Sequence, residues 1–175
     1  MVKVPPIDER RFLELTKNFS KVSRDMGTLG FAQTSADLIE FGQHVGLCWL
    51  KLAVRHLADA KASQKQRGSR RAVLSRSYYA VYNASKAIRY VVQGAVSLRG
   101  DDHQKAVDLP DDFPNVNSWV VDINRLREHR LMADYDGWNA TPTEFSLTSK
   151  RSLELAASFI EEAKRYLEIK YGISL

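Results

Sequence analysis

Apolar residues recur every three or four positions along most of this chain, which is the period of an α-helix that buries one face. The last such stretch has apolar side chains at Leu153, Ala156, Ile160, Ala163 and Leu167. No segment alternates with period two, and no internal repeat is present. The sequence therefore predicts an all-α protein, most simply an antiparallel up-and-down four-helix bundle with an additional N-terminal helix. We expect that helix and a linker to occupy 1–33 and the bundle to occupy 34–175.

The apolar period and its breakers predict five helices and two long connections. The helices are expected over about 8–25, 34–63, 70–93, 116–135 and 147–171. Thr34, with Asp37 three residues later, resembles a capping box that opens the second helix. The segments 94–114 and 136–142 are rich in glycine, proline and aspartate, so they are predicted to be connections rather than core elements.

Composition limits the class of protein. A hydrophobic content of 44% in 175 residues suffices for one buried core, and no apolar run approaches the roughly 20 residues that span a bilayer. The first residues lack the apolar centre of a signal peptide, which favours a cytoplasmic location. Cys48 lies on an apolar stripe, where a buried, unreactive thiol is expected. The four histidines (His44, His56, His103 and His129) show no metal-ligand spacing among themselves or with carboxylates, so we expect no metal ion and no other cofactor.

Two predicted helices carry polar side chains close to the stripe that should face the core. One contains Arg76, Tyr79, Asn83 and Lys86, whose spacing of three and four places them along one face; the other contains Arg130. Buried polar groups cost free energy unless they are paired. We therefore expect the two helices to meet, and we take the four residues of the first helix as candidate ligand-binding residues.

Arg130 and Asp134 are four residues apart, which allows an ion pair along one helical turn. An exposed pair of this kind contributes only about 0.3–0.5 kcal/mol. Its value would therefore lie in orienting Arg130 toward Tyr79, Asn83 or the phosphate of a ligand. By contrast, the Asp-Asp-His run at 101–103 is typical of a solvated loop tip.

The net charge of +5 permits attraction to nucleic acid without requiring it. Basic residues crowd one predicted helix junction at Lys61, Lys65, Arg67, Arg70, Arg71 and Arg76. Charge runs of this kind are usually solvated helix ends. A second basic group lies on the fourth predicted helix, at Arg125, Arg127 and Arg130. The chain has no glycine-rich phosphate loop and no Ser-His-Asp signature, so kinase, dinucleotide-binding and serine-hydrolase functions are not expected.

Two short motifs, RSYYAVYNASKA at 76–87 and RLMADY at 130–135, resemble those of the HEPN superfamily of helical domains. The resemblance covers about residues 35–172. It implies a four-helix bundle that forms a homodimer, with the fourth helix of each subunit near a shared groove. Many members are metal-independent ribonucleases of toxin–antitoxin, CRISPR-associated and other defence systems. Others bind RNA, nucleotides or a partner nucleotidyltransferase.

Catalytic members of this superfamily carry an arginine followed by a histidine about four to six residues later. The pair suits cleavage by the ribose 2′-hydroxyl, which needs a group that titrates near neutrality and a fixed cation beside the phosphate. Here Arg130 is followed by Asp134 and Tyr135, and no histidine comes after it. The resemblance thus indicates Arg130, Asp134 and Tyr135 as candidate catalytic residues. It also makes Tyr135 the nearest counterpart of a tyrosine that a partner nucleotidyltransferase modifies.

Two functions stay open on the sequence alone. The first is a binding module for nucleic acid, a nucleotide or a partner protein, which the missing histidine favours. The second is a metal-independent endoribonuclease that uses Arg130 with Asp134, Tyr135 or His129, contributed across a dimer. In a third interpretation the polar pairs only set the register of the helices.

Overall fold

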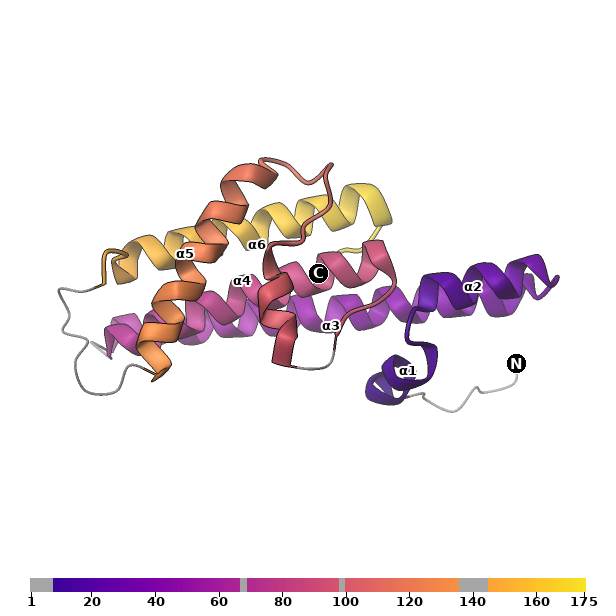
Figure 1. Cartoon of the computed structure of the whole chain (residues 1–175), viewed down its shortest axis with the longest axis horizontal. Coiled ribbons are helices and arrows are strands. Elements are labelled where there is room, and N and C mark those ends of the chain that lie inside the picture. Colours follow the sequence, from indigo (N-terminus) through magenta and orange to yellow (C-terminus); the bar gives the residue numbers. More distant parts are fainter. Residues whose placement is uncertain (1–7, 67–68, 98–99, 136–144) are drawn as a thin grey trace.

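The computed structural model describes residues 8–66, 69–97, 100–135 and 145–175. Within these ranges the chain forms seven helices and no strands, so the predicted all-α fold is confirmed (Figure 1). The helices are α1 (Glu9–Thr16), α2 (Phe19–Thr28), α3 (Ala32–Lys65), α4 (Arg70–Gln93), the 3₁₀ helix η1 (Gly100–Val107), α5 (Val116–Tyr135) and α6 (Ser149–Tyr171). The predicted loop at 136–142 lies outside the described residues, as do Arg67 and Gly68. None of the helices described has both the length and the apolar character needed to cross a membrane.

Helix α4 is the centre of the bundle, because it packs against α3, α5 and α6. Figure 1 shows α3, α4 and α6 running alongside one another, while α5 crosses them steeply. Ala80, Ala84 and Ala87 of α4 are fully buried, and such small side chains let neighbouring helices approach closely. At Gly46 of α3 an added Cβ would lie 2.5 Å from Cγ2 of Val91, so this approach leaves no room for a side chain.

The single helix predicted over 8–25 is wrong, because this part of the chain forms two helices. Lys17 ends α1 with a φ of 50°, and Asn18 opens α2 by accepting a backbone hydrogen bond from its first turn. The apolar period runs through the break because both helices turn apolar residues toward the same small core. That core consists of Phe12, Phe19, Val45 and Tyr90.

Helix α3 begins two residues earlier than the sequence predicts. Its N-cap is Phe31, which makes no side-chain cap hydrogen bond, so the predicted capping box of Thr34 and Asp37 does not form. The Asp37 carboxylate instead accepts a hydrogen bond from Gln33, one turn back. The predicted boundary between the N-terminal region and the bundle stays a prediction.

The segment 94–114 is more than the connection that the sequence predicts. It contains η1, and it buries Ala106, Leu109 and Phe113 against the bundle. The Ser85 hydroxyl of α4 donates a hydrogen bond to the Ala106 carbonyl at 2.7 Å. The segment is therefore part of the core, and it covers one side of α4.

Asp102 of η1 is completely buried, which corrects the prediction of a solvated loop tip. Its two carboxylate oxygens accept hydrogen bonds from Arg89 of α4 at 3.0 and 3.2 Å. The Tyr82 hydroxyl donates to Oδ2 at 2.7 Å, and the Lys86 ammonium lies 3.2 Å from the same oxygen. Burial opposes ionisation, but the hydrogen bonds from Arg89 and Tyr82 outweigh it and lower the pKa of Asp102. Asp102 is therefore an ionised group that anchors η1 to α4.

Replacing Asp102 by Ala should destabilise the fold by about 3–5 kcal/mol, because it leaves the charges of Arg89 and Lys86 buried without their partner. Urea unfolding followed by circular dichroism measures this free energy. Asp108→Ala, an exposed aspartate in the same segment, is the matched control and should change stability by less than about 0.5 kcal/mol. Equal losses in the two variants would contradict the anchoring role.

Candidate functional site

Arg130 lies where α5 crosses α4, and three neighbours hold its guanidinium group. Its Nη2 donates hydrogen bonds to the hydroxyls of Tyr79 and, at 3.2 Å, of Tyr135. Its Nε lies 2.8 Å from Oδ2 of Asp134, one helical turn away. Only 8% of the residue is exposed. The geometry thus brings together Arg130, Asp134, Tyr135 and Tyr79, four residues that the sequence singled out.

The two tyrosines also contact the guanidinium through their rings. The guanidinium carbon lies 5.1 Å from the ring centre of Tyr79 and 4.9 Å from that of Tyr135, within reach of cation–π attraction. Burial works against the charge, but the Tyr79 hydrogen bond outweighs it and raises the pKa of Arg130. Among the described residues, Nη1 of Arg130 has no hydrogen-bond partner. The site therefore holds a fixed cation with donors available to a ligand.

A pocket of about 500 Å³ opens beside this arginine. Three elements line it: α4 with Tyr78 and Tyr79, η1 with His103 and Gln104, and α5 with Arg127, Arg130, Leu131 and Tyr135. Two arginines and three tyrosine rings in one hollow suit a ligand that carries both an anionic group and a flat ring.

His103 enters the pocket from η1, and sequence reasoning missed it. Its Nδ1 lies 3.0 Å from the Tyr78 hydroxyl, and its ring stacks on Tyr82 with the centroids 4.2 Å apart. Partial burial and the nearby charge of Arg130 lower the pKa of His103, so the imidazole is neutral at pH 7. Its Nε2 has no hydrogen-bond partner in the described part of the chain. A histidine does accompany Arg130, but from a different segment than the RLMADY motif.

One sequence signal could have identified His103. Tyr78, Tyr82 and Lys86 form an i, i+4 row on α4, and a partly buried row of this kind needs polar partners from elsewhere in the chain. The Asp-His pair at 102–103 offers an anion and a ring nitrogen in the connection that follows directly. The row and the pair together would have predicted that this connection packs on α4.

The other three predicted ligand-binding residues do not line the pocket. Asn83 is buried and donates to the Tyr79 carbonyl at 2.8 Å, while Lys86 is buried against Asp102. Arg76 is exposed, with Nη1 3.5 Å from Nδ1 of His56. Ten helical residues span about 15 Å, so residues 76 to 86 cannot all reach one small ligand. Among these four candidates, Tyr79 alone faces the pocket.

His129, a candidate in the ribonuclease hypothesis, points away from the pocket. Its side chain is buried, and Nε2 lies 3.1 Å from the Ser146 hydroxyl. Burial, with the charge of Arg125, lowers the pKa of His129. It packs against Phe145 at a ring distance of 5.9 Å, which is a structural contact.

Two arginines at the predicted helix junction bind backbone carbonyls, one in α5 and the other in the segment before α6, which corrects the prediction that this basic cluster is only solvated. Arg71 donates to the carbonyls of Met132 and Ala133 at 3.0 Å each. Arg70 donates to two carbonyls of the segment that leads into α6, at 2.7 and 2.9 Å. Cations are favourable at the carbonyl end of a helix. Arg71 therefore helps to hold the turn of α5 that carries Arg130.

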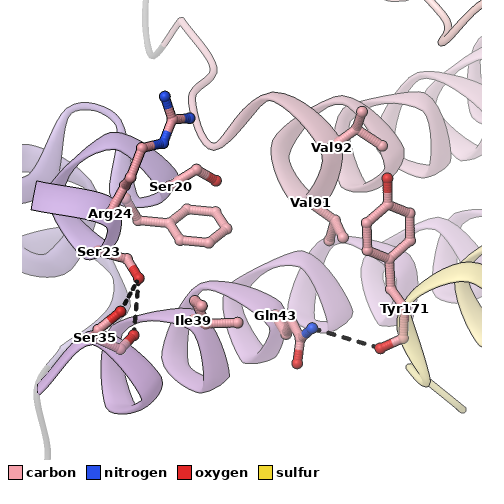
Figure 2. A pocket seen from close by; sticks show the side chains of 10 residues that line it. Ser20, Ser23, Arg24, Ser35, Ile39, Gln43, Val91, Val92 and Tyr171 are labelled. Atoms are coloured by element: carbon pink, nitrogen blue, oxygen red, sulfur yellow. Dashed lines mark hydrogen bonds between the residues drawn. The ribbon is translucent and has the colours of Figure 1, made fainter. Parts of the chain in front are cut away.

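A second hollow, of about 360 Å³, lies between α2, α3 and the ends of α4 and α6 (Figure 2). Figure 2 shows Ser23 hydrogen-bonded to Ser35, where α2 meets α3, and Gln43 donating to the Tyr171 carbonyl. Of the described residues that line it, only Arg24 is charged. With one cation and no acid–base group, this hollow is a weaker candidate than the pocket beside Arg130.

Comparison with known protein families gives a match to the HEPN domain over residues 48–171. No curated protein and no solved structure matches the chain. The matched range begins within α3 and ends with α6, so it contains every residue that lines the pocket beside Arg130. Helices α1 and α2 lie outside it.

Replacing Arg130 by Gln should raise the pKa of His103, because it removes a positive charge that opposes protonation of the imidazole. The measurement is a pH titration of the histidine ring signals by NMR. Arg125→Gln is the matched control: it should raise the pKa of His129 and leave that of His103 unchanged. A His103 pKa that does not move in the Arg130 variant would show that the two side chains are not neighbours.

Proposed function

The chain belongs to the HEPN domain family, and we propose that it is an RNA-binding member whose binding site is the pocket beside Arg130. The proposal rests on one observation: the guanidinium group of this arginine is fixed and still has donors available. Asp134, Tyr79 and Tyr135 hold it in one orientation, while Nη1 keeps its donors for a ligand. The Nη1 donors of a guanidinium fixed in this way are suited to a phosphate oxygen.

The rest of the pocket matches the other parts of a nucleotide. Arg127 adds a second cation for a neighbouring phosphate. The exposed Tyr135 offers an aromatic ring, and stacking on such a ring contributes about 1–3 kcal/mol per base in single-stranded complexes. Because stacking requires unpaired bases, single-stranded RNA or a free nucleotide fits this site better than a duplex.

We propose further that two copies associate through α5. Val121, Leu131 and Tyr135 are large, exposed side chains within about 80° of one another around this helix. An apolar stripe on the outer face of a helix supports burial against a second surface. Trp119, on the same helix, packs on the core. A dimer formed in this way would place two pockets near one seam.

Family membership alone supports the remaining proposals. One is that the chain binds a nucleotidyltransferase-type protein as an alternative partner, which would modify Tyr135. The other is that it acts in a toxin–antitoxin or other defence system. Tyr135 is exposed, as such a modification requires. A cytoplasmic location stays a prediction.

A second candidate function, metal-independent cleavage of RNA, is favoured by one observation, the neutral His103 beside Arg130. A neutral imidazole can take the proton of a ribose 2′-hydroxyl. The 2′-oxygen then attacks the adjacent phosphorus as the bond from phosphorus to the 5′-oxygen breaks. The departing 5′-oxygen takes a proton from water, and the protonated His103 releases its proton to solvent. Arg130 would stabilise the charge that grows on the phosphate. His103 thus supplies the acid–base group that is missing after Arg130 in the sequence.

RNA binding should depend on Arg130. Arg130→Gln should weaken binding of a labelled single-stranded RNA by about 10- to 100-fold, the value of a hydrogen bond to a charged group. Binding should also weaken with salt, and loss of one phosphate contact should reduce the slope of log K against log salt by about 0.7. Fluorescence anisotropy of wild type, Arg130→Gln and the exposed control Arg165→Gln measures both effects. Equal affinity in the three proteins would exclude this pocket as the RNA site.

Cleavage, if His103 is the base, should occur with a chelator present and fall about 10²- to 10⁴-fold in His103→Gln. The rate should be near its maximum at pH 7 and decrease as the pH falls through the pKa of His103, because the protonated ring cannot accept a proton. His129→Gln, on the other side of α5, should cleave as wild type does. A wild-type protein that binds RNA without cutting it would reject this candidate and leave the binding function.

A further inference from the structure

Three potential metal ligands meet at the surface where α1 lies against α3. Nε2 of His44 lies 3.3 Å from Oε1 of Glu9 and 3.7 Å from Sγ of Cys48. The three ligand atoms all lie within 4.8 Å of one another. Cys48 is only partly buried, which corrects the prediction of a buried, inert thiol.

These separations are close to those of a tetrahedral site. Bonds of about 2.0–2.1 Å from Zn²⁺ to nitrogen or oxygen, and of about 2.3 Å to sulfur, place neighbouring ligand atoms about 3.3–3.6 Å apart. The two contacts of His44, at 3.3 and 3.7 Å, agree with these edge lengths. The carboxylate of Glu9, on a flexible and exposed side chain, can complete the triangle.

The fold brings the ligands together before any ion binds. His44 and Cys48 are one helical turn apart on α3, so they project from the same face. Glu9 is the first residue of α1, which Phe12 fastens to α3 through a ring contact of 4.7 Å with Phe41. A site assembled by packing in this way does not require the chain to rearrange on binding.

We propose that Glu9, His44 and Cys48 bind a divalent transition-metal ion, with Zn²⁺ as the best match. A thiolate and an imidazole favour zinc over Mg²⁺ or Ca²⁺, which prefer oxygen ligands. Three protein ligands leave one position of the tetrahedron for water, and the exposed rim admits solvent. Binding replaces the proton of the Cys48 thiol by the metal and releases that proton to solvent.

The site would have a structural consequence that is separate from RNA binding. Its ligands join α1 to α3, and α1 lies outside the range that matches the HEPN domain. The ion would therefore clamp α1, which lies outside the matched range, onto α3. Sequence reasoning overlooked the site because it compared histidines with histidines and carboxylates, whereas the i, i+4 partner of His44 is the cysteine.

Titration of the full chain with Co²⁺, which replaces Zn²⁺ in such sites, tests the proposal. One equivalent should produce the visible bands of tetrahedral cobalt and a thiolate-to-cobalt charge-transfer band, and Zn²⁺ should displace both. Cys48→Ser should abolish the charge-transfer band, and Glu9→Gln, a change at an exposed residue, should weaken binding at least about tenfold. His56→Gln, a histidine elsewhere on α3, is the control and should bind as wild type does.

Two outcomes would contradict the proposed metal site. Absence of a charge-transfer band in the wild type would show that Cys48 is not a ligand, and the contacts would then be an ordinary hydrogen-bonded cluster. Binding that is equal in wild type and Glu9→Gln would exclude the link to α1. Because the readout is spectroscopic, a failure here is distinct from a failure of the RNA-binding proposal.

Discussion

The buried contact between Asp102 and Arg89 is the interaction on which the candidate site depends. It fixes η1 against α4, and η1 carries His103. A buried ion pair is costly to desolvate, and this one is balanced by further partners, since Tyr82 and Lys86 also contact the carboxylate. The result is a rigid support at the base of the pocket. Without it, the segment 94–114 would lose its buried ion pair with the bundle.

A second constraint is the charge of Arg130, which lies on the α5 side of the pocket. Arg130 is almost buried, so the fold has to satisfy its charge, and it does so with one carboxylate and two phenol hydroxyls. These partners restrict the guanidinium to one orientation. Arg71, bound to the last carbonyls of α5, steadies the same turn. The pocket therefore lies between two fixed polar groups, and a ligand would meet a site that is already organised.

Membership of the HEPN family and the geometry of the pocket point to the same part of the chain. The family match includes α4, η1 and α5, and these three elements supply the cations, the rings and the histidine. The N-terminal helices, outside the match, form their own small core on α3. The chain thus combines a family bundle with an attached N-terminal pair of helices. The bundle carries the candidate RNA site, and the N-terminal pair of helices contributes Glu9 to a separate cluster of candidate metal ligands.

The amino-acid sequence by itself determined the all-α class, the bounds of α4 and α5 to within a residue, and the partnership of Arg130 with Asp134, because these follow from helical period and from contacts one turn apart. It also indicated that Tyr79 would meet Arg130, since polar groups on two core-facing stripes need one another. Only the tertiary structure decided that Asp102 is buried, that His103 joins the pocket, and that Asn83 and Lys86 face elsewhere. Those outcomes depend on how a connection without helical period folds back over α4, and local spacing carries no information about such long-range packing.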